Sequence, residues 1–284
     1  MIFQGNFQYF DIWDAVESGL YYAIVGFYFL IFAYFLLMRF RTSKKFYWLY
    51  FSLLFLCLAA GRVFFIVYYF YIPELLGTMT NLELVGLLMI LYRLATFSTW
   101  LGIACLMGVF GTLIFSSYTE EEKPSEKEDL KFKINTLLRK NRVRKSLKIL
   151  LVLFPIGIGI LALTLPDSLF MDPDFNEAPY CAGIELITIF GYPAGRFVLN
   201  FILLPLMVLV IPILFVYLAL KTFGVLRRSY ALNAIGFFIY FFGRISQGLM
   251  ETLGFYHVRA ILSPLLILLS LLIIVIANHY EQLK

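Results

Sequence analysis

The sequence predicts an all-α, polytopic membrane protein: a bundle of seven transmembrane helices with the N-terminus outside and the C-terminus in the cytoplasm. Of the 284 residues, 62% are hydrophobic and only 14% are charged, against about 25% charged in an ordinary soluble domain. A compact soluble fold of about 300 residues buries only about 75% of the surface that its chain exposes. Lipid must therefore solvate much of this chain, and its long apolar stretches indicate membrane-spanning helices.

Seven apolar stretches long enough to cross the hydrocarbon core follow one another along the chain, at residues 18–38, 46–72, 84–115, 146–165, 183–220, 229–254 and 258–277. A crossing needs about 20 residues, because an α-helix rises by about 1.5 Å per residue. Six of the stretches have a length that fits one crossing. The single domain of residues 1–284 is therefore expected to be the helix bundle itself.

The stretch at 183–220 is too long for one crossing and too short for two. Pro193, flanked by two glycines, interrupts its first third, and a proline disfavours helix in the residue before it. We expect this crossing to begin near Arg196. The preceding residues 183–195 then belong to an outer loop region, 166–195, as a loop or as a short re-entrant segment, with an extension of the fifth helix as the third alternative.

Lysine and arginine residues fall almost entirely on one side of the predicted bundle. Eighteen of the 23 basic residues lie in 39–45, 118–148, 221–228 and the C-terminal tail, whereas the loops on the opposite side contain Arg259. Cytoplasmic loops of membrane proteins carry this excess of Lys and Arg. The sequence therefore predicts a multi-pass protein of the cell membrane, with residues 118–148 and the C-terminus inside.

Several function classes have no support in the sequence. The net charge of +5 does not indicate nucleic-acid binding, because the basic residues sit at the ends of apolar segments. Phosphate-binding glycine motifs are absent, and two His and three Cys are too few for a metal cluster or a disulfide framework. We therefore expect no cofactor, no metal and no nucleic-acid partner. The predicted crossings contain no recognisable set of catalytic residues, so an enzyme is not the leading prediction. An intramembrane enzyme is kept as an alternative.

The one sizeable polar segment, 118–148, starts acidic and ends basic. Interleaved apolar residues would make part of it an amphipathic helix at the membrane surface. The segment is either a solvated linker with a positive-inside anchor, or a docking site for a cytoplasmic protein partner or anionic lipid.

Arginines inside the predicted crossings are the most informative feature. Arg62, Arg93 and Arg244 each lie nine or ten residues from the outer end of a stretch, which places them at a common depth of about 15 Å. One arginine at the centre of a membrane helix costs about 2.5–3.5 kcal/mol on insertion scales. These side chains must face the bundle interior, a partner or a wet cavity.

Polar neighbours recur at helical spacing around these arginines, and together they make a candidate ligand-binding site: Arg62, Tyr69, Arg93, Thr96, Trp100, Arg196, Asn200, Tyr240, Arg244, Gln247 and Glu251. Arginines outnumber carboxylates in this set. One interpretation is a polar network that holds the helices together. The other is an outward-facing site for an anionic or amphiphilic ligand, such as a small molecule or a lipid headgroup, because the guanidinium fork binds anions bidentately.

A two-residue repeat adds a further alternative. Gly61 precedes Arg62 and Gly243 precedes Arg244, in the second and sixth stretches. These two spans are where a parallel three-plus-one-plus-three duplication, a known transporter architecture, would be found, and chance similarity of two residues is the other interpretation. The sequence therefore predicts a receptor-like or sensor-like membrane protein that signals to a cytoplasmic partner through 118–148. The alternatives are a transporter of a small anionic solute and a structural or assembly subunit.

Overall fold

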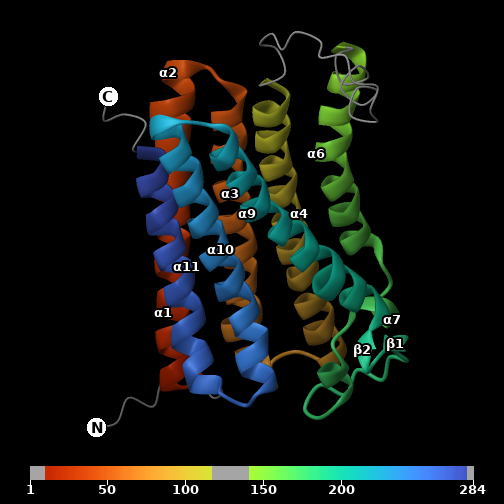
Figure 1. Cartoon of the computed structure of the whole chain (residues 1–284). Coiled ribbons are helices and arrows are strands. Elements are labelled where there is room, and N and C mark those ends of the chain that lie inside the picture. Colours follow the sequence, from red (N-terminus) through yellow and green to blue (C-terminus); the bar gives the residue numbers. More distant parts are fainter. Residues whose placement is uncertain (1–9, 117–140, 280–284) are drawn as a thin grey trace.

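A computed structural model describes residues 10–116 and 141–279; within these ranges the side chains of 114–116, 141, 247–249, 251, 252 and 256 are not described. Long helices run side by side and form one bundle (Figure 1). In the described part of the chain, six helical segments are long and apolar enough to cross a membrane: Ile12–Ser43, Phe46–Leu75, Asn81–Leu113, Arg142–Thr164, Ala194–Lys221 and His257–His279. The predicted all-α, multi-pass membrane fold is thereby confirmed.

The helix at the sixth predicted crossing, α10 (Gly224–Thr252), is 29 residues long. It lies in the same bundle, against α9 (Leu204–Lys221) and α11 (Tyr256–His279). Its length of roughly 44 Å suits a crossing, but polar residues such as Asn233 and Arg244 lower its hydropathy below that of the six segments. A seventh crossing by α10 stays a prediction, as does the orientation of the termini.

The first half of the bundle consists of three long helical segments with irregular ends. Its elements are α1 (Ile12–Ala33), the π-helix η1 (Tyr34–Phe40), α2 (Arg41–Ser43), α3 (Phe46–Ile66), the π-helix η2 (Val67–Tyr71), the 3₁₀-helix η3 (Pro73–Leu75) and α4 (Asn81–Ser116). The helix α1 begins six residues before the predicted position 18. A capping box starts it there, because the side chains of Asp11 and Asp14 accept each other's backbone N–H at 2.8 and 3.1 Å.

The second half opens with α6 (Asn141–Thr164), and a compact segment at residues 166–195 follows it, which we call the outer segment after the side on which the sequence predicts it. The remaining elements are α7 (Asp167–Phe170), the 3₁₀-helix η5 (Pro173–Asn176), strands β1 (Thr188–Ile189) and β2 (Tyr192–Pro193), α8 (Ala194–Arg196), the π-helix η6 (Phe197–Leu203), α9, α10 and α11. The segment 183–195 thus contains a β-hairpin. Phe190 and Gly191 at its tip both have positive φ, at 52° and 82°, as a two-residue hairpin turn of type I′ requires.

The two ends of the bundle differ in what they carry. The helix α1 starts at the end that also holds α7 and the β-hairpin, whereas α11 finishes at the opposite end, beside α2 (Figure 1). We refer to these as the α7 end and the α2 end. The segment 117–140, which includes most of the predicted docking loop, lies outside the described residues.

Candidate functional site

A cavity of about 240 Å³ lies between α3, α4, α10 and the segment formed by η6 and α9. Its lining residues are Arg62, Phe65, Tyr69, Tyr92, Thr96, Thr99, Trp100, Asn200, Leu204 and Arg244. The fold thus brings together several predicted site residues from distant parts of the chain, namely Arg62, Tyr69, Thr96, Trp100, Asn200 and Arg244. Two basic side chains and several polar and aromatic ones share this small interior space.

Some lining residues were absent from the prediction. On α4, the cavity is lined by Tyr92, Thr96 and Thr99, which recur at spacings of four and three residues, as one face of a helix requires. The predicted polar face of this helix started at Arg93 instead. Because one residue turns a helix by about 100°, the predicted face included Thr96 but not Tyr92. Phe65 and Leu204 carried no polar signal that could have marked them.

Arg62 is buried, with only 5% of its surface exposed. Its guanidinium carbon lies 4.3 Å from the ring centroid of Tyr21, and the Tyr21 hydroxyl donates to the Glu17 carboxylate at 2.9 Å. A second oxygen of Glu17 lies 3.5 Å from Arg259. Arg62 is therefore stabilised by a cation–π contact from α1, while the Glu17 carboxylate bound to Tyr21 is paired with a different arginine.

A glycine next to each cavity arginine lets two helices approach closely. A Cβ atom at Gly61 would lie 3.2 Å from the backbone oxygen of Ala95 on α4. A Cβ at Gly243 would lie 3.1 Å from Cβ of Leu266 on α11. Small residues of this kind bring backbones together in membrane bundles. Each glycine thus faces the next helix, and the arginine after it turns toward the cavity.

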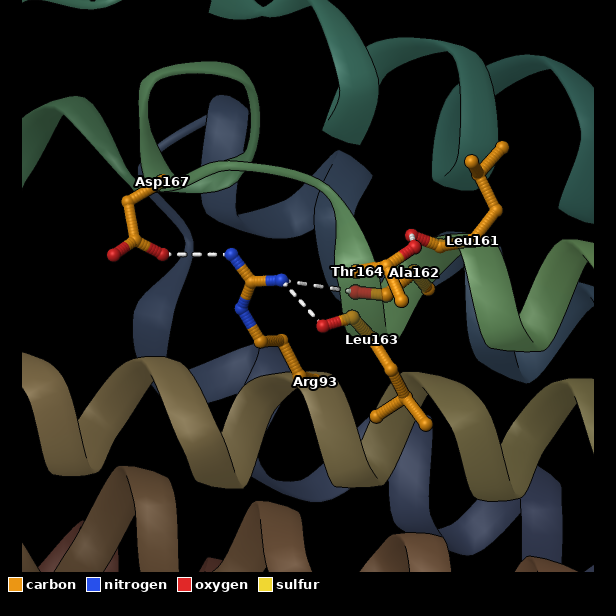
Figure 2. A network of polar contacts seen from close by, with 6 residues as sticks. All are labelled: Arg93, Leu161, Ala162, Leu163, Thr164 and Asp167. Atoms are coloured by element: carbon orange, nitrogen blue, oxygen red, sulfur yellow. Dashed lines mark hydrogen bonds and ion pairs between the residues drawn. The ribbon is translucent and has the colours of Figure 1, made fainter.

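Arg93 does not line the cavity. Figure 2 shows its side chain leaving α4 toward the end of α6. It donates to the carbonyl oxygens of Leu163 at 2.9 Å and Ala162 at 3.4 Å, and pairs with Asp167 at 2.7 Å. Carbonyls in the last turn of a helix lack intrahelical partners, and a cation there is favourable. The expectation that Arg93 shares one site with Arg62 and Arg244 is therefore wrong, because this guanidinium caps α6.

Arg196 also lies outside the cavity, directly behind one wall of it. Its guanidinium carbon is 4.0 Å from the ring centroid of Tyr92, and it forms an ion pair with Asp172 of the outer segment. The Tyr92 hydroxyl in turn accepts a hydrogen bond from the Asn200 amide at 2.6 Å. The wide turns of η6 carry Asn200 at their centre, and π-helical turns often occur at functional sites. This bond joins α4 to η6 across the cavity.

The remaining predicted residues come from α10. Tyr240 lines a much smaller void of about 10 Å³ that adjoins the cavity through Arg62 and Arg244. The side chains of Gln247 and Glu251 lie outside the described residues, although both positions belong to α10. The predicted part of Gln247 and Glu251 in the candidate site therefore stays a prediction.

Four phenylalanines close the bundle between the cavity and the α2 end. Phe51 of α3, Phe237 of α10, Phe215 of α9 and Phe110 of α4 are all buried. Consecutive ring centroids in this series are 6.3, 5.4 and 5.1 Å apart, within the range of favourable aromatic pairs. The same four helices thus line the cavity and pack against one another through aromatic side chains between the cavity and the α2 end.

The electrostatics of the cavity are unbalanced. Among the described side chains, no carboxylate forms an ion pair with Arg62 or Arg244. Trp100 is fully buried, and its indole Nε1 has no hydrogen-bond partner among the described residues. Because that nitrogen has no accessible surface, it does not open onto the cavity. The two guanidinium groups without a described counter-ion make the cavity suited to an anion.

Within residues 10–116 and 141–279, no group of three or more His, Cys, Asp or Glu side chains is placed to hold a metal ion. No family model matches the chain, and comparisons with curated proteins and with solved structures found no match.

Proposed function

We propose that this chain is a receptor-like or sensor-like membrane protein that binds an anionic ligand in the cavity between α3, α4, α9 and α10. One observation carries the proposal: Arg62 and Arg244 line the same cavity, and neither forms an ion pair with a described carboxylate. Each arginine at mid-membrane depth costs about 2.5–3.5 kcal/mol. A bound anion would offset that cost.

The proposal includes seven crossings, with the N-terminus outside and the C-terminus in the cytoplasm of a cell. The excess of basic residues in 39–45, 118–148 and 221–228 supports this orientation. The start of α1 and the end of α11 lie at opposite ends of the bundle (Figure 1), which supports an odd number of crossings.

In this orientation the ligand enters from the outer side, since the packed phenylalanine cluster lies between the cavity and the inner end of the bundle. Tyr92 and Asn200 then join two helices on the path of entry. The signal would leave through 118–148, whose basic end suits an acidic protein partner or anionic lipid. A ligand that draws α3 and α10 together through their arginines would move the inner ends of these helices.

A transporter of a small anionic solute is the second candidate, and the glycine–arginine pairs favour it. Gly61 packs α3 against α4, and Gly243 packs α10 against α11. In each of the two halves, α1–α3–α4 and α9–α10–α11, the glycine of the middle helix thus contacts the third helix. In the sequence, α6 lies between the two halves. Parallel repeats of this kind occur in transporters that bind substrate at the repeat interface.

Thermal unfolding of the purified chain in neutral detergent tests the anion site. A ligand that binds only the folded state adds about 2.7 kcal/mol of stability at one hundred times its dissociation constant. A panel of carboxylates, sulfates and phosphates should contain members that raise Tm for the parent protein but not for Arg62→Gln or Arg244→Gln. Flux of the same anions into proteoliposomes separates the two candidates: a transporter moves the solute, whereas a receptor binds it without flux.

A further inference from the structure

We infer that the cavity binds the phosphoryl group of a small phosphate monoester. This inference rests on the proposed function and narrows its ligand class. Charge is the first argument. Arg62 and Arg244 bring two positive charges to one cavity, and a phosphate monoester carries about −1.5 to −2 near pH 7. A single carboxylate would leave one guanidinium uncompensated in the bundle interior, where an unpaired charge is costly.

The arrangement of donors is the second argument. They come from three different helices: Arg62 from α3, Thr96 from α4 and Arg244 from α10. The Thr96 hydroxyl makes no hydrogen bond within the described residues. A phosphoryl group offers three strong acceptor oxygens, one more than a carboxylate. Arginine forks bind such oxygens bidentately.

Size and wall chemistry define the rest of the ligand. A volume of about 240 Å³ equals the share of roughly eight water molecules in the liquid. That space holds a phosphoryl group and a compact organic body. Phe65, Tyr69, Tyr92 and Leu204 line the remainder, so the body would be apolar or aromatic. A soluble ester and the headgroup of a single-chain lipid share this chemistry.

Phenyl phosphate and phenyl sulfate form a matched pair of probes, because they share a tetrahedral head and an aromatic body and differ by about one negative charge. In thermal unfolding titrations of the full chain at pH 7.5, phenyl phosphate should stabilise the protein with an affinity roughly tenfold or more above that of phenyl sulfate. This advantage should vanish at pH 5, since the phosphate gains a proton as pH falls through about 6, whereas arginine stays charged.

Variants locate the binding. Arg62→Lys and Arg244→Lys keep the positive charge and the fold but lose the fork, so each should weaken phenyl phosphate binding severalfold. Arg93→Lys is the control, because Arg93 caps α6 outside the cavity, and it should bind phenyl phosphate like the parent.

Further probes identify the source and separate the possible failures. Inorganic phosphate and a short-chain lysophosphatidic acid show whether a soluble or a lipid phosphate binds more tightly. Equal binding of phosphate and sulfate, a pH-independent affinity, or stabilisation by benzoate alone overturns the phosphoryl inference and leaves an anion site standing. If no anion of the panel stabilises the parent protein, the inference and the proposed function both fail.

Discussion

Arg62 of α3 and Arg244 of α10 face one cavity, and each follows a glycine that packs its helix against the next. Arg93, at the same predicted depth, points away from them and caps α6. Arginines that look equivalent in the sequence therefore have two different surroundings. Arg62 and Arg244 have no described carboxylate within ion-pairing distance. Arg93 has its own carboxylate and carbonyl partners. Mutations at the two kinds of position should have opposite effects.

Arg93→Gln should destabilise the folded bundle by about 1–3 kcal/mol, because it leaves the Leu163 carbonyl and Asp167 without their charged donor. Asp167 is about half exposed, so water takes over part of its solvation and Asp167→Asn should cost less. Thermal unfolding in detergent measures both. An unchanged Tm for Arg93→Gln would show that this guanidinium does not hold α6 to α4.

Arg62→Gln and Arg244→Gln should leave the ligand-free protein as stable as the parent or more so. Each change removes one of two like charges from the same cavity without breaking a described ion pair. The measurement is Tm of each variant without added anion, compared with Arg93→Gln in the same detergent. A large loss of stability in both variants would favour a closed structural network over a ligand site.

Gly61→Ala should destabilise the protein by about 1–3 kcal/mol. The new Cβ would lie 3.2 Å from the backbone oxygen of Ala95, which cannot move without shifting α4. Gly26→Ala is the matched control, since a Cβ at Gly26 meets nothing within 4 Å; it should be neutral or add up to about 1 kcal/mol from helix propensity. Comparable Tm values for the two variants would mean that α3 and α4 have room to separate.

An impermeant thiol reagent applied to intact cells tests the orientation. Cys181 is exposed in the outer segment, so the parent protein should already be labelled. In a Cys181→Ser background, Glu177→Cys should restore labelling, because this side chain is exposed at the α7 end. Ser125→Cys should remain unlabelled until the membrane is permeabilised. Labelling at position 125 in intact cells would reverse the predicted topology.

The sequence alone determined the class of the protein and the general placement of its charges. A soluble fold of this size cannot bury so many long apolar stretches. The helical membrane fold could therefore be predicted from composition and spacing. The free energy needed to place a charged arginine side chain in hydrocarbon likewise predicted that Arg62, Arg93 and Arg244 face the interior of the bundle. Both arguments concern a chain in its solvent and need no knowledge of which helix neighbours which.

Tertiary structure decided which polar side chains meet. A helix turns by about 100° per residue, so a one-residue error in choosing the face of α4 exchanges Tyr92 for Arg93, and the two point to different neighbours. The β-hairpin before Ala194 and the pairing of Arg196 with Asp172 depend on how the outer segment folds back. Periodicity gives the direction of a side chain from its own helix axis, whereas only the packed arrangement of helices gives the partner at which it points.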